Sequence, residues 1–241
     1  FLKIPYIGFS FNHFLRGALT IYPETFAVFF FFIFLIFLLK DRFFLSGIFC
    51  SLIIFLRPNY LPICVITFIY YLYLYYNTQN FKKLFLGTLG LSFVFLIPFH
   101  NLFYGQENFA FLTSSSKISV NLKVHPSEYF YFFSNKNTQL KITNHLLNLI
   151  STGERNNFFA YFINSIFLTN LILFNIFMIK HLNKKIVLIS FFAISLLTVS
   201  LFYSNTGRYA YFPWFLIFIS NILIIKQFFN KEFSFPIFKK N

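Results

Sequence analysis

The sequence predicts an all-α, polytopic membrane protein with about seven transmembrane helices and one mixed extracytoplasmic loop region. Three observations lead to this fold class. Hydrophobic residues make up 58% of the 241 residues, and charged residues only 11%. The apolar residues stand in long blocks, which is typical of membrane spans and not of a soluble domain with one core. Short basic clusters separate these blocks, so the net charge of +14 indicates a membrane partner and no nucleic acid.

Each apolar block is predicted to form one membrane-spanning helix. In chain order the blocks are 24–39, 43–56, 60–76, 84–104, 158–179, 186–203 and 209–225. The predicted organisation is an N-terminal extracytoplasmic or interfacial remnant (1–22), four helices (23–104), a loop region (105–157), three helices (158–226) and a cytoplasmic tail (227–241). The chain begins with Phe1, and its first residues form neither a clean signal peptide nor a full span, so we expect a truncated start.

The basic clusters predict the orientation of these helices, because Lys and Arg accumulate on the cytoplasmic side of membrane proteins. With one crossing per block, all the clusters fall on one side. They are Lys40-Asp41-Arg42, Lys82-Lys83, Lys180 with Lys184-Lys185, and the lysines from Lys226 onward. The region 105–157 and the turns at Arg57 and Arg208 then lie outside the cytoplasm. The shortest block, 43–56, is the weakest element, since all later helices would invert if it did not cross.

The loop region contains three predicted elements. A β-like stretch over 109–124 has apolar residues at alternate positions near its end. Pro126 suits the first turn of a short aromatic helix through Phe133. A second helix is predicted from Thr138 to Ser151, with Gly153 as its C-cap. It is amphipathic, with Ile142, Leu146, Leu149 and Ile150 on the apolar face and Lys141, Asn144, His145 and Asn148 on the polar face.

Several common site types have no sequence signal. Cys50 and Cys64 lie inside apolar blocks, where they are predicted to be small buried hydrophobic residues and not a disulfide or a metal site. The chain has no phosphate-binding glycine loop, no HExxH motif and no GxSxG motif. It also has no fixed-period repeat and no inverted pair of broken helices of the kind that many transporters contain.

Arg57 is the first candidate site residue, because it follows an apolar block too short to cross a bilayer. The block 43–56 spans roughly 21 Å at about 1.5 Å per residue, against a hydrocarbon core of about 30 Å. A guanidinium group below the membrane surface normally faces a polar cavity with a partner. An interfacial anchor that snorkels to the headgroups explains the same position equally well.

Other polar residues gather at the predicted extracytoplasmic ends of the helices. Each has a structural explanation, such as a helix-start carboxylate, backbone satisfaction near Pro98, or an interfacial aromatic belt. Together they suit a phosphate or pyrophosphate, which two guanidinium groups would bind with several charge-assisted hydrogen bonds. Besides Arg57, the set comprises Glu24, Asn59, His100, Asn101, Tyr104, Arg208 and Tyr209.

The order of these motifs resembles the GT-C membrane glycosyltransferases, in the bacterial branch near the protein mannosyltransferases and the aminoarabinose transferases. The likeness covers most of the chain through short motifs. They are Tyr22-Pro23-Glu24-Thr25, a helix containing Gly47 and ending in Leu56-Arg57-Pro58-Asn59, Pro98-Phe99-His100-Asn101-Leu102-Phe103-Tyr104-Gly105, and Gly207-Arg208-Tyr209. The resemblance implies a bacterial inner-membrane enzyme that takes a sugar from a polyprenyl-phosphate donor. The acceptor would be an extracytoplasmic glycan, lipid or protein.

The resemblance also implies roles for individual residues. The main catalytic carboxylate of such enzymes lies in the first extracytoplasmic loop, which we expect upstream of this chain, so the fragment alone is expected to be inactive. Asp41, on the predicted cytoplasmic side, cannot replace it. Glu24 is then a secondary acidic candidate, and Arg57, His100 and Arg208 are candidate contacts to the donor phosphate. Some relatives use a divalent metal, but no ligand set in this chain supports one, and no other cofactor is expected.

Two other functions remain open from the sequence. A transporter or flippase for lipid-linked saccharides would use the same basic outer face, but it would need a polar path through the membrane. A non-enzymatic protein of envelope assembly would leave every polar residue in its structural role. An upstream span followed by an Asp-bearing loop would favour the transferase.

Overall fold

All the elements that the structure describes are helices. The structure is a computed structural model, and it describes residues 23–103, 124–150, 158–177, 182–202 and 211–229. Its α-helices are α2 (Pro23–Leu39), α3 (Phe43–Leu56), α4 (Leu61–Thr78), α5 (Phe81–Ser92), α6 (Leu96–Phe103), α7 (Lys136–Ile150), α8 (Phe158–Phe177), α9 (Lys184–Ser200) and α10 (Tyr211–Phe229). Three 3-10 helices accompany them: η1 (Pro58–Tyr60), η2 (Phe93–Phe95) and η3 (Pro126–Tyr131). The predicted all-α class is therefore confirmed for the described residues.

The seven apolar blocks are helical where they are described, with the block 84–104 divided among α5, η2 and α6, and α3 has the bounds that the sequence predicts. By length and composition alone, two described helical stretches could cross a membrane: 81–103, which joins α5, η2 and α6, and 212–229 in α10. Three further apolar helical stretches, in α2, α3 and α8, have fewer than the 18 residues taken here as the minimum for a span. The number of membrane spans therefore stays a prediction. The helical state of the blocks is confirmed for the described residues.

Capping side chains account for two helices that begin earlier than predicted. The Asn135 Oδ1 atom accepts from the backbone N–H groups of Asn137 and Thr138 at 3.0 and 3.2 Å, so α7 starts at Lys136. The Asn183 Oδ1 atom accepts from the Lys185 N–H at 3.0 Å, and α9 starts at Lys184. At the other end of the chain α10 continues to Phe229, so the boundary expected at 227 falls inside a helix.

The loop region is helical where it is described. Pro126 opens η3 as predicted, although this short aromatic helix has 3-10 geometry and ends at Tyr131, before the predicted Phe133. The predicted β-like stretch 109–124 lies outside the described residues except for Val124, and the predicted C-cap Gly153 lies outside them entirely.

Aromatic side chains form the core between α2, α9 and α10. Phe31 and Phe34 of α2 are fully buried, as is Phe192 of α9. The Phe31 ring lies 4.9 Å from the Phe212 ring of α10 and 5.8 Å from the Phe192 ring, with both pairs edge to face. Trp214, two residues further along α10, is also buried. These Phe side chains thus serve packing.

Small residues allow α3, α4 and α5 to pack closely. A Cβ atom added at Gly47 of α3 would come within 2.7 Å of the Gly90 backbone of α5, so the two backbones touch. The Ser51 hydroxyl donates across this contact to the Gly90 and Leu91 carbonyls, both at 3.2 Å. Close approach at small residues with a bridging hydroxyl is a common way for helices to associate inside a membrane.

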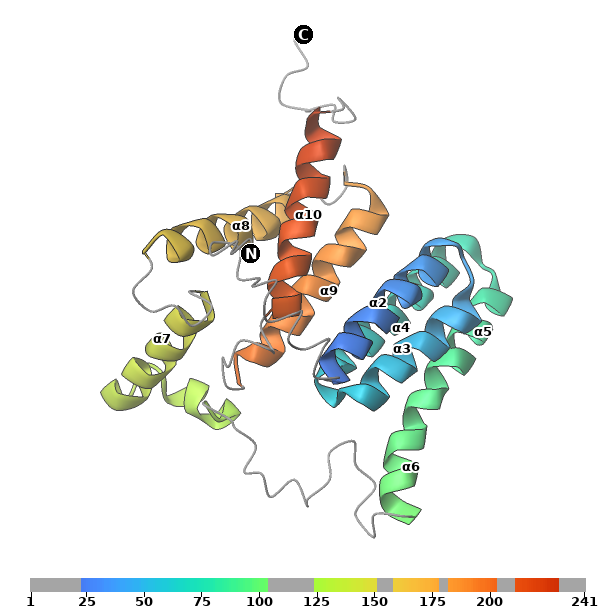
Figure 1. Ribbon diagram of the computed structural model, residues 1–241, viewed down its shortest axis with the longest axis horizontal. Coiled ribbons are helices and arrows are strands. Elements are labelled where there is room, and N and C mark those ends of the chain that lie inside the picture. The colour runs from blue at the N-terminus through green and yellow to red at the C-terminus, as the bar shows by residue number, and fades with distance from the viewer. Residues whose placement is uncertain (1–22, 104–123, 151–157, 178–181, 203–210, 230–241) are drawn as a thin grey trace.

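The helices fall into two groups. Figure 1 shows α2 to α5 on one side and α8 to α10 on the other, with α9 packed against α4 between them. Consecutive helices α2, α3, α4 and α5 run in alternating directions. Helices η3 and α7 lie beside the end of α9 at which α10 begins.

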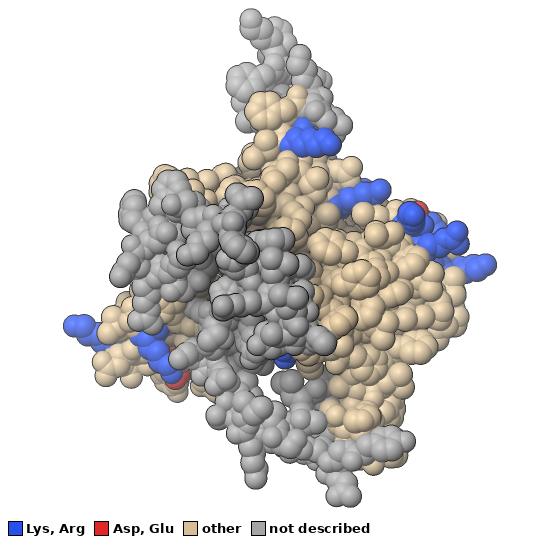
Figure 2. Space-filling view, in the orientation of Figure 1, with Lys and Arg blue, Asp and Glu red and all other residues tan. Residues whose placement is uncertain are grey.

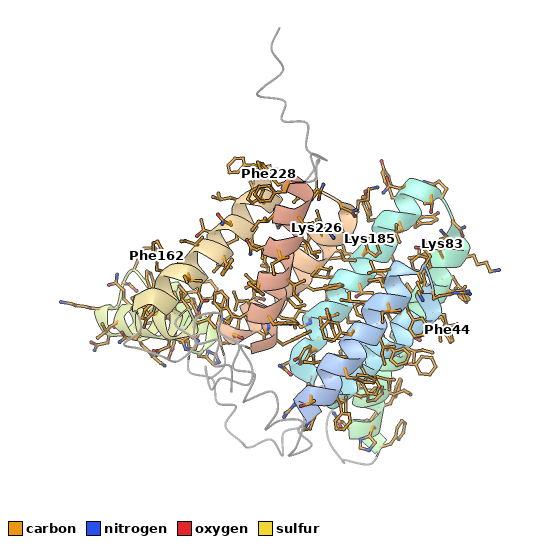
Figure 3. All side chains as sticks on the ribbon, turned by 45° about the horizontal axis from the view of Figure 1, so that its top comes forward. Phe44, Lys83, Phe162, Lys185, Lys226 and Phe228 are labelled. Carbon is orange, nitrogen blue, oxygen red and sulfur yellow. The ribbon has the colours of Figure 1, made fainter. Side chains whose placement is uncertain are left out.

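Figure 2 shows Lys and Arg side chains gathered along one edge of the molecule. This edge lies at the helix ends away from η3 and α7. In Figure 3, Lys83, Lys185 and Lys226 lie at this same edge. A separate group of basic side chains lies at the left of this view, where α7 lies in Figure 1.

Candidate functional site

The Arg57 turn ends α3 and connects it to α4. Arg57 has extended backbone angles, φ −150° and ψ 100°, and its N–H still donates to the Ile53 carbonyl at 2.9 Å. The cause is Pro58, whose ring disfavours helical angles in the preceding residue. Pro58 then starts η1, which is closed by a 3.0 Å bond from the Tyr60 N–H to the Arg57 carbonyl. The side chains of Arg57 and Asn59 are both half-buried.

Tyr60 fixes this turn against the last helix. Its side chain is only 4% exposed, and its ring lies 5.9 Å from that of Phe212 in α10. Helix η1 also packs against α9. The turn therefore lies next to the start of α10, the helix that follows Gly207-Arg208-Tyr209 in the sequence. The predicted residues Arg208 and Tyr209 themselves lie outside the described residues, as does Tyr104.

The other described candidates lie on α6. His100 is exposed and Asn101 is buried, both on α6. In Figures 1 and 3, α6 extends away from α9 and α10, beside which the Arg57 turn lies. Arg57 and Asn59 share the turn after α3, while His100 and Asn101 belong to α6, which follows the 3-10 helix η2 that packs against α3. Glu24 is in the first turn of α2, at the same end, and its side chain lies outside the described part.

Pro98 lies in the first turn of α6. The 3-10 helix η2 at Phe93–Phe95 precedes it and joins α5 to α6. Pro98 is the third residue of α6, and the missing N–H group of a proline is tolerated in the first turn of a helix, where the N–H has no partner within that helix. Asn101 is a buried residue of the same helix.

A second polar arrangement, which the sequence did not predict, covers the end of α9. The His145 Nε2 atom donates to the Ser200 carbonyl at 3.1 Å. The Tyr129 hydroxyl donates to the Leu201 carbonyl at 2.7 Å, and the Val124 N–H to the Phe202 carbonyl at 3.5 Å. The last carbonyls of a helix have no partner inside it. Three consecutive carbonyls at the end of α9 are thus bonded by the segment 124–150.

The same segment is held by two donors from other helices. Trp214 of α10 donates from Nε1 to the Leu149 carbonyl at 3.3 Å, and Asn164 of α8 donates from Nδ2 to the Ile150 carbonyl at 2.7 Å. His145, predicted to be exposed on the polar face of α7, is 5% exposed. That prediction is wrong because α7 turns His145 with Ile142 and Leu149 toward the other helices. The spacing of residues within α7 does not indicate that His145 is buried, because its acceptor, the Ser200 carbonyl, lies far along the chain.

Glu128 connects η3 to α7 on the outer surface of this segment. Its two carboxylate oxygens accept from the Lys141 ammonium group at 2.7 and 2.8 Å. One of them also accepts from the His125 N–H at 3.3 Å as part of a capping box. The hydrogen bond from Lys141 lowers the pKa of Glu128 below its ordinary value. Burial of the Tyr129 hydroxyl raises its pKa.

Within the described ranges, no three His, Cys, Asp or Glu side chains lie close enough to hold a metal ion. Cys50 is buried and Cys64 is half-buried, and both are free thiols. No protein-family model, curated protein or solved structure matches the chain. The resemblance to the GT-C enzymes, and the residue roles that it implies, therefore stay predictions.

Proposed function

We propose that this chain is part of a polytopic glycosyltransferase of the bacterial inner membrane. It would move a sugar from a polyprenyl-phosphate donor to an extracytoplasmic glycan, lipid or protein acceptor. In this proposal the seven apolar helices cross the membrane, and the edge that carries Lys83, Lys185 and Lys226 faces the cytoplasm. The single observation that carries the proposal is the position of Arg57.

Arg57 lies at the end of a helix of 14 residues. Such a helix is about 21 Å long, while the hydrocarbon core is about 30 Å thick. Its partly buried side chain belongs to a turn that packs on α9 and α10, and not to the lipid-facing side of an isolated helix. A guanidinium group in this position suits an anionic group that reaches the bundle from the membrane.

A phosphate in a lipid-linked donor fits this position by charge and by geometry. The planar guanidinium group presents a fork of N–H donors that matches two phosphate oxygens. In the transfer, the acceptor hydroxyl oxygen would form a bond to the anomeric carbon while the bond from that carbon to the phosphate oxygen breaks. An acidic residue implied by the resemblance would take the hydroxyl proton. Arg57 would stabilise the charge that develops on the departing phosphate.

The test is sugar transfer by the full-length protein carrying Arg57→Lys. Lysine keeps a cation that can snorkel, but it loses the two-pronged donor set. A phosphate ligand should lose about tenfold or more in transfer rate, which is the kinetic equivalent of about 1.4 kcal/mol and within the range of a hydrogen bond to a charged group. Arg57→Gln should be slower still.

Arg42→Lys is the matched control, because it makes the same substitution at the opposite end of α3, where Arg42 precedes the first turn. It should leave transfer unchanged. Turnover is measured in membranes with a polyprenyl-phosphate sugar donor, at matched expression and over a range of donor concentrations. Equal rates and equal donor dependence in Arg57→Lys and the parent would assign Arg57 to an anchoring role and remove it from the donor site.

A further inference from the structure

A groove between α4 and α9 is not used by the proposed transfer reaction. Its volume is about 610 Å³, within the range of about 300–1,000 Å³ that small-molecule sites occupy. Ile66, Ile69 and Tyr73 line it from the middle of α4, and Val187 and Phe191 from the first half of α9. Lys184, the first residue of α9, is the charged residue among those that line it.

The walls of this groove are apolar and accessible. Ile69 is 56% exposed and Phe191 is 43% exposed, whereas Leu188, also in the lining, is buried. The exposed walls and buried base define a channel along the helices that a linear hydrocarbon chain would cover. In a membrane, only lipid is present at this depth in large amounts.

Lys184 stands where the groove meets the helix ends. Its Nζ atom lies 5.2 Å from the centre of the Tyr73 ring on α4. A cation over an aromatic ring is attracted by the ring face, so Tyr73 holds the ammonium group over the groove. The site therefore combines an apolar channel with a positive charge at one end. The channel matches the acyl chain of a phospholipid, and the charge matches its phosphate.

The surrounding charge favours an anionic lipid over a neutral one. Figure 3 shows Lys83, Lys185 and Lys226 at the same edge of the molecule. Among the described residues at these helix ends, a single acidic residue, Asp41, is accompanied by Lys40, Arg42, Lys82, Lys83, Lys184, Lys185 and Lys226. The anionic lipids of the cytoplasmic leaflet attract such basic surfaces.

We propose that the groove between α4 and α9 binds one acyl chain of an anionic phospholipid of the cytoplasmic leaflet, with the lipid phosphate at Lys184. This inference rests on the membrane orientation of the proposed function but not on the transfer reaction. The site would lie at the opposite end of the helices from Arg57, so it is a structural or regulatory lipid site separate from the donor site.

The test compares binding of phosphatidylglycerol and phosphatidylcholine with identical acyl chains. The full chain is purified in detergent micelles, each lipid is titrated, and native mass spectrometry counts the bound molecules. We expect one molecule of phosphatidylglycerol to bind with clear preference over phosphatidylcholine. Lys184→Gln should weaken phosphatidylglycerol binding about fivefold, which corresponds to the value of about 1 kcal/mol for one basic residue near an anionic lipid surface.

Two further variants separate the groove from general surface charge. Lys82→Gln removes the same charge from the same end of the molecule, at α5 and outside the groove lining, and should weaken phosphatidylglycerol binding less than Lys184→Gln does. Val187→Trp fills the groove while retaining Lys184, and should lower binding of both lipids. Each variant is compared with the parent for its elution profile and thermal unfolding, so that a folding defect is recognised.

Equal binding of the two lipids by the parent would overturn the proposal, as would an equal loss in Lys184→Gln and Lys82→Gln. A groove filled by a neutral lipid, or by another part of the chain, would give one of these results. The measurement does not involve sugar transfer. A failure here therefore leaves the role of Arg57 untouched, and a failure of the Arg57 test leaves this measurement interpretable.

Discussion

At the scale of single residues, Glu128 is the acidic group that connects two elements of the segment 124–150. Its carboxylate bonds both the His125 N–H of the capping box and the Lys141 ammonium group of α7. The Lys141 side chain is 49% exposed and that of Glu128 31% exposed, so the pair is screened by water. We therefore expect its contribution to stability to be at most about 1 kcal/mol, the upper range for exposed ion pairs.

The lowered pKa of Glu128 makes this contribution depend on pH. A carboxyl group with a pKa lower in the folded than in the unfolded protein stabilises the fold above its unfolded pKa. That stabilisation is lost as pH falls through the folded pKa. The parent should lose more stability between pH 7 and pH 3 than Glu128→Gln, in which the amide does not titrate.

The fluorescence of Trp214 reports unfolding, because it is the one Trp of the chain and it donates to the Leu149 carbonyl of α7. Its emission is followed during urea unfolding in detergent micelles at both pH values. Lys136→Gln, which removes a charge from α7 outside this pair, is the control and should retain the pH dependence of the parent. An equal pH-dependent loss in the parent and in Glu128→Gln would contradict the assignment.

Residue roles were predictable from sequence where the cause is local. Arg57 ends its helix because the next residue is proline, and the sequence contains that cause. The burial of His145 depends on a carbonyl of Ser200 at the end of another helix. Helical spacing placed His145 among polar residues, and no property of its neighbours indicates that a helix end lies above it.

At the scale of elements, the apolar blocks predicted helix positions well because each block is long and ends at charged or turn-forming residues. Asp41 and Gln79 adopt left-handed backbone angles, φ 56° and 52°, in the short turns after α2 and α4. The contact of Gly47 with Gly90 was not predicted, because small residues mark a close approach only when the partner helix is known.

Gly90→Ala tests this contact through the sign of its effect. In an ordinary helix interior the change stabilises by about 1 kcal/mol. Here the new Cβ atom would meet the Phe44 carbonyl oxygen and the Gly47 Cα atom, both backbone atoms that cannot move alone. We expect a net destabilisation of about 1–3 kcal/mol, the usual cost of overpacking, and a lower midpoint of thermal unfolding in detergent.

Leu89→Ala is the matched control for Gly90→Ala, since Leu89 is the adjacent residue of α5 and is 43% exposed. It should shift the unfolding midpoint little. Ser51→Ala removes the hydroxyl that bonds the Gly90 and Leu91 carbonyls and should be intermediate. A midpoint raised by Gly90→Ala would show that α3 and α5 do not touch at this position.

At the scale of the whole molecule, the alternating directions of the helices bring together basic clusters that are far apart in sequence. Lys83, Lys185 and Lys226 belong to α5, α9 and α10, yet they lie at one edge (Figure 3). The pattern of charge along the sequence predicted this arrangement. It could not predict how α8 and α7 pack on the bundle, because those contacts depend on carbonyl groups and ring positions rather than on apolar length.

This separation of charge predicts which residues are accessible from each side of the membrane. Lys136 and Lys82 are both exposed, at opposite ends of the molecule. In a background of Cys50→Ala and Cys64→Ala, Lys136→Cys should react with a membrane-impermeant maleimide in intact cells. Lys82→Cys should react only after the membrane is permeabilised. The two positions control for each other, because each has an exposed side chain on a described helix.

The opposite pattern of labelling would invert the topology and place the Arg57 turn in the cytoplasm, where an extracytoplasmic donor phosphate could not reach it. Labelling of both positions in intact cells would show that α2 to α5 do not separate two compartments. The observed basic edge supports the first pattern, because moving those lysines and arginines across the membrane would oppose the positive-inside rule at α5, α9 and α10 together.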